Sequence, residues 1–501
     1  MDKILKHILG VSAGFHDAAL SVVANSGDIV FAGHSERYSK NKNDANLCPD
    51  IISEIANFEI DTVSYYETPW RKQFRQLYSG QSVSLGSVTA RQILHNQGLS
   101  QVMHAPQVQV HTQNHHMSHA AAGFQTSPYD HATVVVIDAI GEWDSISIWA
   151  ARYDPLGKAQ YRKLWGQRYP HSIGLMYSAI TARVGLRPMD EEYILMGMAG
   201  YGHDHLVPSL TDALVSDPYE IKLRHNLHTG LPPEVLPDSD HYDLAAAAQS
   251  VAETLIYNVM QRARDYNWSG NLVYMGGVAL NCLANRDLGK YFDNVWIMPN
   301  PGDAGSSLGA AALSYGKKLN WQDAYLGHVI PGPYPVAILL NQLVTNKIVG
   351  VASGAAEFGP RALGNRSLLA DPRGAEIKDK VNEIKRRQKF RPFAPVILAE
   401  HVHAYFDMPI GWADSNYMQV VAKCRHPALF PAICHVDGTS RVQTVPPNSR
   451  SGIRQLLEQW YETTGCPMLL NTSLNIRGEP MVDTRADADR FEKKYHVPVA
   501  S

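Results

Sequence analysis

Hydrophobic positions along the chain form short runs that are separated by glycine-containing turns. Residues 8–32 predict a strand, a turn and a second strand, because short β-branched runs are flanked by Gly and Asp. Residues 134–140, VVVIDAI, predict a further buried strand that includes Asp138. Residues 271–285 and 295–316 each predict a strand, a glycine turn and a helix. Such units point backbone N–H groups at an anion above the strand ends, so we expect an α/β nucleotide-binding domain.

A stretch rich in proline and glycine, LGHVIPGPYPVA at 326–337, is the predicted linker. After it, KIVGVASG at 347–354 predicts a strand. The remainder of the chain alternates predicted strands with loops rich in Arg, Asn and Ser. We therefore expect two domains, residues 1–330 and residues 331–501.

Composition narrows the class of protein. The chain has 501 residues, of which 45% are hydrophobic and 19% charged, as in a folded protein of two or three domains. A formal net charge of -3 gives no global sign of a polyanion partner, although a local basic surface stays open. Five scattered cysteines without CxxC spacing disfavour zinc-thiolate or disulfide frameworks. Without a signal-peptide core or an 18-residue apolar run, we expect a cytoplasmic protein and no membrane partner.

The sharpest local motif is NHHMSHAAAGF at 114–124. His115 and His119 are four residues apart, so on a helix they share one face and can chelate one metal ion. Asp138, at the end of a predicted strand, and Asp303, in the turn PGDAGSS, are candidate third and fourth ligands. Two imidazoles with two carboxylates suit Fe(II), Mn(II) or Zn(II). The alternatives are a capped helix start for the histidines and turn or cap positions for each aspartate.

Glycine turns predict a nucleotide cradle nearby in the fold. Gly276 and Gly277, with Asn281, follow one predicted strand, and Gly302 opens the turn after the next. Glycine is needed where backbone approaches a ligand closely, although a tight strand-to-helix turn would use the same residues. His16, followed by Asp17, is a candidate base for an acceptor hydroxyl, with a solvated turn histidine as the alternative.

The C-terminal part is rich in side chains that bind anions. Guanidinium groups bind phosphate and carboxylate in pairs of hydrogen bonds, and Asn or Ser beside them can orient a planar amide. A surface ion pair is the alternative for any single arginine. The candidates are Arg361, Asn365, Arg366 and Arg373 in 357–374, Lys385, Arg386, Arg387, Lys389 and Arg391 in 384–395, Arg441 in 435–445, and Asn471, Ser473, Asn475 and Arg477 in 469–480.

Several of these segments together resemble the O-carbamoyltransferase family of nodulation-factor, tobramycin and cephalosporin carbamoyltransferases. The resemblance spans nearly the whole chain and is most specific in three motifs. These motifs are FGPRALGNRS, FRPFAP and LLNTSLNIRGEP. It implies an ASKHA-type (actin/Hsp70-like) N-terminal domain that resembles threonylcarbamoyl transferases, and a YrdC-like C-terminal domain. It also implies that carbamoyl phosphate and ATP yield carbamoyl-adenylate, from which an acceptor hydroxyl takes the carbamoyl group.

The resemblance also assigns roles to residues. It implies a divalent metal, with iron favoured, and a donor site for carbamoyl phosphate and the adenylate. The implied sets are His115, His119, Asp138 and Asp303 for the metal, Gly276, Gly277, Asn281, Gly302 and Glu142 for the nucleotide, His16 with Asp17 for catalysis, and Arg361, Asn365, Lys385, Arg387, Arg391, Arg441, Asn471 and Ser473 for the donor.

Departures from the family pattern affect the expected donor site. Ala355 and Gln388 stand where the family has an arginine and an acid, and Gly200 replaces a proline. The sequence also ends soon after RGEPMVDT, where relatives continue through a further helix. These departures bear on the geometry of the donor site and leave the class unchanged.

The sequence leaves the acceptor open between two classes. The opening of the chain looks like that of phage and environmental viral members, some of which are similar to enzymes that carbamoylate 5-hydroxymethylcytosine in DNA. RYSKNK at 37–42 and YETPWRKQFR at 66–75 interleave cations with aromatic rings, which suits phosphates and bases. The alternative acceptor is a small hydroxyl compound such as a sugar or an aminoglycoside. A tRNA threonylcarbamoyl enzyme and an inactive nucleotide sensor are less favoured classes, and a homodimer is one open assembly.

Overall fold

A computed structural model describes residues 6–81, 83, 88–103, 107–388 and 390–501. The chain divides into two compact units. The first unit consists of Met1–Gly14, Ser21–Ile29 and Phe58–Trp321, and the second of Phe15–Leu20, Val30–Asn57 and Gln322–Ser501. The expected domain boundary at residue 330 stays a prediction. In the described part of the chain, no helix is long and apolar enough to cross a membrane.

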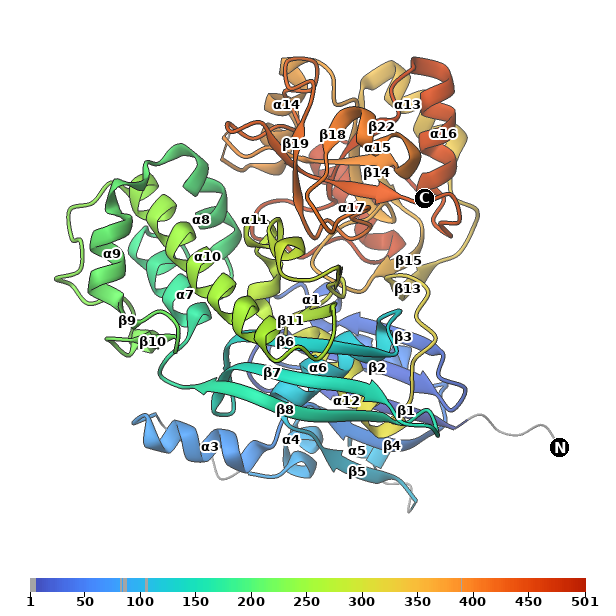
Figure 1. Ribbon diagram of the computed structural model, residues 1–501. Coiled ribbons are helices and arrows are strands. Elements are labelled where there is room, and N and C mark those ends of the chain that lie inside the picture. The colour runs from blue at the N-terminus through green and yellow to red at the C-terminus, as the bar shows by residue number, and fades with distance from the viewer. Residues whose placement is uncertain (1–5, 82, 84–87, 104–106, 389) are drawn as a thin grey trace. The chain divides into compact units, whose positions relative to one another are not determined.

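The N-terminal two thirds of the chain builds two five-stranded sheets with helices packed on them (Figure 1). The first sheet has the strand order β3-β2-β1-β4-β5, in which β1, β4 and β5 run parallel. Residues of β1 and β2 are almost all buried, as expected for strands covered on both faces. These strands are β1 (His7–Ser12), β2 (Ala19–Ala24), β3 (Ile29–His34), β4 (Ile60–Tyr65) and β5 (Gln109–Thr112).

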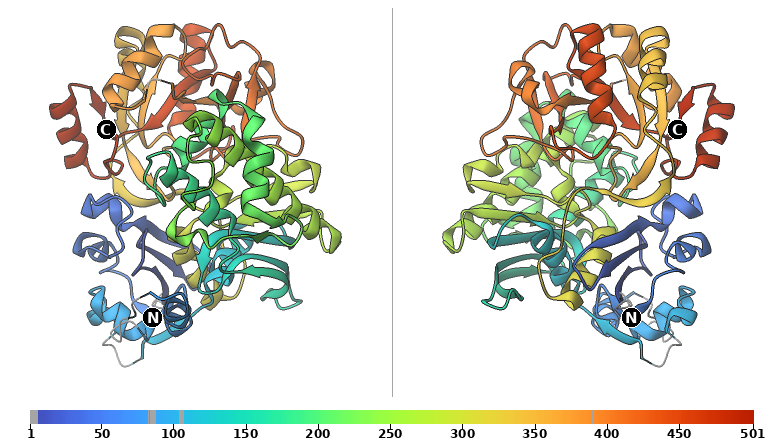
Figure 2. Two further views of the ribbon diagram at one scale, coloured as in Figure 1. Left: turned by 90° about the vertical axis from the view of Figure 1, so that its left-hand side faces the viewer. Right: turned by 90° about the vertical axis from the view of Figure 1, so that its right-hand side faces the viewer.

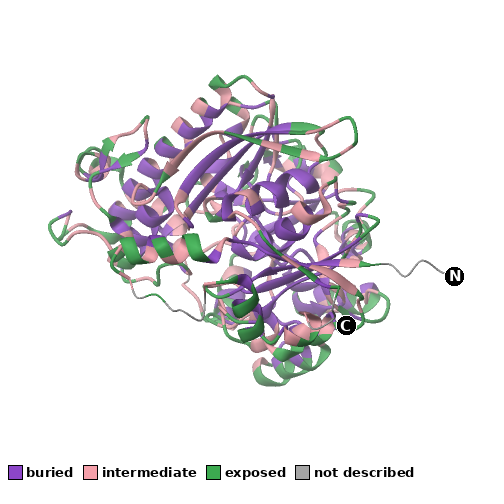
Figure 3. Cartoon of the chain, turned by 90° about the horizontal axis from the view of Figure 1, so that it is seen from below, coloured by how far each residue is buried: buried purple, intermediate pink, exposed green. Residues whose placement is uncertain are grey.

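The second sheet has the order β12-β11-β6-β7-β8, with β6, β11 and β12 parallel and the other pairs antiparallel. The predicted strand at 134–140 lies within β6, and the two predicted strand–turn–helix units are confirmed. Figure 3 shows the strands of the interior largely in purple, whereas outer helices carry green. The strands are β6 (His131–Gly141), β7 (Asp144–Tyr153), β8 (Ala159–Arg168), β11 (Asn271–Met275) and β12 (Asn294–Trp296).

The helices of the first unit include the one predicted from the histidine motif. The longest of them, α10, begins after Asp240, whose side chain accepts from the N–H groups of Tyr242 and Asp243. They are α3 (Pro69–Tyr78), α4 (Ala90–Asn96), α6 (His115–Thr126), α7 (Ile173–Arg183), α8 (Glu192–Met198), α9 (Val207–Leu214), α10 (His241–Asp265), α11 (Cys282–Asn285) and α12 (Ser306–Tyr315).

The second unit is built on a six-stranded sheet with the order β21-β17-β22-β16-β14-β23. Its helices α13 and α16 lie side by side, as Figures 1 and 2 show, and bury Leu339, Leu343 and Leu457 in one apolar core. The strands are β14 (Ile348–Ala352), β16 (Arg366–Ala370), β17 (Ala394–Leu398), β21 (Gln443–Val445), β22 (Met468–Ser473) and β23 (Val499–Ala500). The helices include α13 (Val336–Asn346), α14 (Ala375–Lys385), α16 (Ile453–Thr464) and α17 (Arg485–Tyr495).

The predicted linker at 326–337 is wrong over most of its length. Residues Tyr325–Ile330 form strand β13, which pairs antiparallel with β15 (Gly354–Glu357), and α13 begins at Val336. The prolines at 331, 333 and 335 are therefore confined to the connection between a strand and a helix, where no ladder hydrogen bond is required of them. The composition correctly predicts a turn at these prolines, but pairing with β15 makes the residues before it a strand.

Candidate metal centre and anion-binding site

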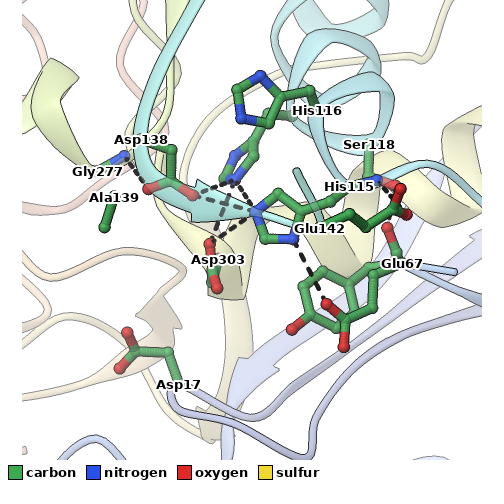
Figure 4. Close-up of polar contacts among 12 residues, drawn as sticks. Asp17, Glu67, His115, His116, Ser118, Asp138, Ala139, Glu142, Gly277 and Asp303 are labelled. Atoms are coloured by element: carbon green, nitrogen blue, oxygen red, sulfur yellow. Dashed lines mark hydrogen bonds and ion pairs between the residues drawn. The ribbon is translucent and has the colours of Figure 1, made fainter. Parts of the chain in front are cut away.

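Four metal-ligating side chains converge in the first unit. The ligand atoms of His115, His119, Asp138 and Asp303 all lie within 4.8 Å of one another, and all four residues are buried (Figure 4). Nε2 of His115 lies 3.1 Å from Oδ2 of Asp138 and 3.4 Å from Oδ1 of Asp303. Nε2 of His119 lies 3.2 Å from Oδ1 of Asp303 and 3.1 Å from Nε2 of His115. The structure thus brings together all four residues that the sequence nominated.

Local sequence explains how three elements meet at this point. Helix α6 begins at His115 because the side chain of Asn114 accepts from the N–H of Met117 at 3.1 Å. Asp303 lies just before α12, which packs closely on α6: a Cβ at Gly309 would collide with the carbonyl oxygen of Ser118. Asp138 projects from β6, next to α6 in the fold. The small residues of α12 therefore set the distance between the histidine pair and Asp303.

The Nδ1 atoms of both imidazoles, which point away from the cluster, also have defined neighbours. Nδ1 of His119 lies 3.0 Å from the carbonyl oxygen of Pro301, which can only accept, so Nδ1 carries a proton and Nε2 is the nitrogen that would bind a metal. Nδ1 of His115 faces Oε2 of Glu67 at 3.8 Å, which favours the same tautomer. Two imidazole lone pairs and two carboxylates then point at one small volume. A divalent cation fits this donor set, because it is the charge that would satisfy all four groups.

The electrostatics of the four groups agree with a cation site. Burial lowers the pKa of His115, but Asp303 and Asp138 outweigh it and raise that pKa well above its usual value. Burial raises the pKa of Asp138, whereas hydrogen bonds from His115 and His119 bring it well below the usual range. The two carboxylates therefore hold positive charge at this point, which protons supply when no metal is bound.

Two buried glutamates lie beside the cluster: Glu67, which the sequence did not nominate, and Glu142, which was expected at the nucleotide site. Glu67 is buried and pairs with Nζ of Lys72 at 2.8 Å. Glu142 accepts hydrogen bonds from the backbone N–H of Thr68 at 2.7 Å and of His115 at 3.3 Å. These contacts hold the starts of α3 and α6 together. No spacing rule could have found Glu67, because its partner His115 lies 48 residues further along the chain and meets it only in the fold.

The predicted glycine cradle lies beside the cluster. The N–H of Gly277 points at Oδ1 of Asp138 at 3.3 Å, and Gly276 has a φ of 91°, a conformation that other residues rarely adopt. A Cβ at Gly302 would meet no described atom within 4 Å, so this backbone borders open space. Asn281 exchanges two amide hydrogen bonds of 3.0 Å with Gln249 of α10. Gln249 is a further polar residue that the sequence did not point to.

His16 and Asp17 lie in the second unit, in the turn before β2. Nδ1 of His16 contacts Oδ2 of Asp17 at 2.8 Å, and both side chains are partly exposed. Asp17 has a φ of 53°, in the left-handed region that aspartate tolerates. This contact can hold one tautomer of the imidazole, as expected of a general base, and the catalytic role stays a prediction.

The predicted anion-binding residues lie in the second unit. Lys385, at the end of α14, is buried and donates to the carbonyl oxygen and the hydroxyl of Ser473 at 2.5 and 3.0 Å. Burial, with the charges of Arg387 and Arg391, lowers the pKa of Lys385 well below its usual value. Three cations at close quarters are unfavourable without counter-charge, so the arrangement suits a phosphate or carboxylate ligand. Lys389 lies outside the described residues.

A second set of predicted donor residues lies on the adjoining strands and turns. Asn471 of β22 donates to the carbonyl oxygen of Ala362, next to Arg361, and to the side chain of Gln443. Gln443 follows Arg441 by two residues and was not nominated from the sequence. Asn365 donates to the carbonyl oxygen of Ala355 and accepts from the hydroxyl of Ser451. Their role in binding the donor stays a prediction.

Two arginines expected to bind anions have structural partners instead. Arg366 is fully buried and donates to five carbonyl oxygens, among them those of Asp483, Ser353 and His328. Arg373 forms an ion pair with Asp371 at 2.8 Å. Both guanidinium groups are occupied, because a buried donor fork must be satisfied within the fold.

The basic-aromatic segment 37–42 is wrong as a surface for nucleic acid. Arg37 is buried and donates to the carbonyl oxygen of Gly359 at 2.7 Å, and the hydroxyl of Tyr38 is buried too. Lys40 pairs with Asp487 at 2.6 Å. Within the second segment, 66–75, Tyr66 and Arg75 are likewise buried. The alternation of cations and aromatic rings predicts exposed side chains, but Arg37 and Lys40 contact residues that are far away in the sequence.

Comparisons with known proteins show which proteins this chain resembles. The carbamoyltransferase N-terminus family matches residues 71–312, and the carbamoyltransferase C-terminus family matches residues 340–499. An uncharacterized protein of Synechocystis, sll1178, is 32% identical over 97% of this chain and 94% of its own length. Nodulation protein NolNO of Sinorhizobium fredii is 29% identical over 97% of this chain and 78% of its own. Nodulation protein NolO of Bradyrhizobium diazoefficiens is 30% identical, over 75% of each chain.

The chain belongs to the carbamoyltransferase family and is a carbamoyltransferase enzyme. The family matches cover both the segment that carries the metal cluster and the segment that carries Lys385. The expected α/β class is confirmed by the mixed sheets and their packed helices.

Proposed function

We propose that the enzyme is an O-carbamoyltransferase that works in two half-reactions, one for each unit. The observation that carries the proposal is the buried cluster of His115, His119, Asp138 and Asp303 in a chain of this family. On the basis of the sequence motifs, we also propose that the first unit is an ASKHA-type domain and the second a YrdC-like domain.

The second unit would form the activated donor. Carbamoyl phosphate loses its phosphoryl group to water as phosphate, and the carbamate oxygen then bonds to the α-phosphorus of ATP as pyrophosphate leaves. The product is carbamoyl-adenylate, in which AMP is a good leaving group. Lys385, Arg387 and Arg391 would hold the phosphate groups, supported by the depressed pKa of Lys385, which an anionic ligand would relieve.

The first unit would carry out transfer. The acceptor hydroxyl oxygen attacks the carbamoyl carbon, AMP leaves, and the hydroxyl proton passes to a base. A divalent ion held by His115, His119, Asp138 and Asp303 would act as a Lewis acid towards the phosphate of the adenylate. The backbone of Gly277 and of Gly302 would lie along that phosphate, because glycine allows backbone to approach a ligand closely and a Cβ at Gly302 would meet open space.

The acceptor is proposed to be a small hydroxyl compound rather than 5-hydroxymethylcytosine in DNA. Support comes from the burial of Arg37 and Arg75, which removes two of the cations that a phosphate backbone would need. Carbamoylated DNA stays the alternative outcome.

Two variants separate the half-reactions. Arg391→Ala should lose carbamoyl phosphate-dependent release of pyrophosphate from ATP and keep metal binding. Asp303→Ala should keep pyrophosphate release and lose transfer to any acceptor. The proposal fails if Asp303→Ala transfers the carbamoyl group at the wild-type rate, or if pyrophosphate release does not depend on carbamoyl phosphate.

A further inference from the structure

Helix α3 carries a buried arginine whose charge is not paired. Arg75 is 4% exposed, and its Nε and Nη1 atoms are buried without a hydrogen-bond partner in the described part of the chain. The two glutamates that pair with cations of this helix are occupied elsewhere. Glu67 pairs with Lys72 at 2.8 Å, and Glu142 lies 3.5 Å from Arg71. A buried charge is costly unless it is paired, so Arg75 lacks the counter-charge that its burial requires.

The neighbours of Arg75 are an aromatic ring and a histidine rather than acids. Its guanidinium lies 5.8 Å from the centre of the Tyr169 ring, near the limit of about 6 Å for a cation–π contact. The ring of His228 lies 6.0 Å from that of Tyr169. The Tyr169 hydroxyl accepts from Nδ2 of Asn226 at 2.5 Å. These contacts give the guanidinium weak compensation and no negative charge.

The imidazole of His228 adds a further buried donor. The side-chain amide nitrogen of Gln81 lies 2.8 Å from Nε2 of His228. An amide nitrogen can only donate, so Nε2 accepts and Nδ1 carries the proton. That Nδ1 is buried and has no acceptor among the residues that the structure describes. Burial and the charge of Arg75 both lower the pKa of His228, so its imidazole is neutral at neutral pH.

This cluster lies within electrostatic reach of a residue beside the metal centre. Burial lowers the pKa of Arg75, and Tyr169 and Glu67 oppose that effect. Glu67 in turn faces Nδ1 of His115 at 3.8 Å (Figure 4). Tyr169 and His228 are partly exposed, so the cluster is reached from solvent. All of these residues belong to the first unit.

We propose that Arg75, His228 and Tyr169 form a binding site for a small oxyanion, a carboxylate or phosphate group. Such a group accepts hydrogen bonds through several oxygens and brings the negative charge that the cluster lacks. Water would satisfy the donors but not the charge, and a metal ion would be repelled by it. Because Arg75 is 4% exposed, the site suits a small anion rather than the backbone of a nucleic acid. The proposed carbamoyl transfer assigns no ligand to these residues, and the proposed donor residues lie in the second unit.

The test follows His228 by histidine-selective NMR, which reports on this cluster alone. Inorganic phosphate and acetate are titrated in separate arms at constant ionic strength, set with chloride, and the His228 signal is identified with His228→Gln. At least one anion should shift that signal and raise the pKa of His228, because a bound anion favours the charged imidazole. The arm with the higher affinity identifies the group as phosphate or carboxylate. Arg75→Met should weaken the apparent affinity about tenfold or more.

A matched control and a stability measurement separate binding from a structural role. Arg162→Met removes an exposed arginine of the same unit that lies 5.7 Å from the ring of Trp268, and it should respond to the anion as the wild type does. Without oxyanions, Arg75→Met should unfold at the wild-type temperature or higher, because it removes an unpaired buried charge. The inference is overturned if neither anion affects His228, if Arg75→Met responds as the wild type does, or if Arg75→Met unfolds at a lower temperature, as expected of a guanidinium that water holds in a structural role.

Discussion

Replacing Glu67 by glutamine tests whether a residue that is not itself a metal ligand stabilises the proposed metal centre. Glu67 faces Nδ1 of His115 at 3.8 Å, whereas the corresponding nitrogen of His119 is held by a backbone carbonyl at 3.0 Å. Loss of an outer partner of a metal-binding histidine typically weakens metal binding by about 10- to 100-fold. Because 3.8 Å exceeds a normal hydrogen bond, we expect the lower limit, about tenfold or about 1.4 kcal/mol.

The assay is calorimetric titration of metal-free enzyme with Mn(II) at one pH and well below the unfolding temperature. Glu67→Gln also disturbs the pair with Lys72, so thermal unfolding of the metal-free protein is measured separately. The matched control is Glu192→Gln in α8, where the carboxylate accepts from the hydroxyl of Ser178 at 2.5 Å. An unchanged affinity in Glu67→Gln, or an equal loss in the control, would refute the proposed support of His115.

Three further predictions concern the backbone proposed to border a phosphate and the proposed donor site. Gly276→Ala should destabilise the enzyme by about 1–3 kcal/mol in urea unfolding, because of its φ of 91° and a collision with the carbonyl of Ile137. Gly302→Ala should change the free energy of unfolding by no more than about 0.5 kcal/mol. It should nevertheless slow carbamoyl transfer, because its Cβ would enter the open space in which we propose that the phosphate binds. Equal transfer rates in the variant and the wild type would exclude that position for the phosphate. The pKa of Lys385 is lowered, so this side chain loses its charge at a lower pH than an ordinary lysine does. The KM of the wild type for carbamoyl phosphate should therefore rise with pH. In Lys385→Met the KM should be high at every pH. A pH-independent wild-type KM would contradict this role.

The meeting of the four candidate metal ligands could be predicted from sequence because each has a local signature. The spacing of His115 and His119 is that of one helix face, and Asp138 and Asp303 occupy a strand end and a glycine turn, positions that face ligands in α/β sheets. The strand–turn–helix units were predictable for the same reason.

Features that depend on contacts between distant segments could not be predicted. Glu67 and Gln443 act through partners far along the chain, and Arg37 meets a carbonyl group 322 residues away. The segment 326–330 looked like a linker by composition, and only its pairing with β15 makes it a strand. In α3, the sequence pattern predicts one shared surface of cations and aromatic rings, whereas the structure buries Arg75 and exposes Trp70 and Phe74.

The most direct test is mass spectrometry of the hydroxyl panel after incubation with ATP, carbamoyl phosphate and Fe(II) or Mn(II). The panel holds several sugars, an aminoglycoside and DNA that contains 5-hydroxymethylcytosine. We predict the mass gain of one carbamoyl group on a small hydroxyl compound with the wild type, and none with Asp303→Ala, while both release pyrophosphate. Carbamoylation that persists in Asp303→Ala, or the absence of any carbamoylated hydroxyl with active donor chemistry, would contradict transfer at the metal centre.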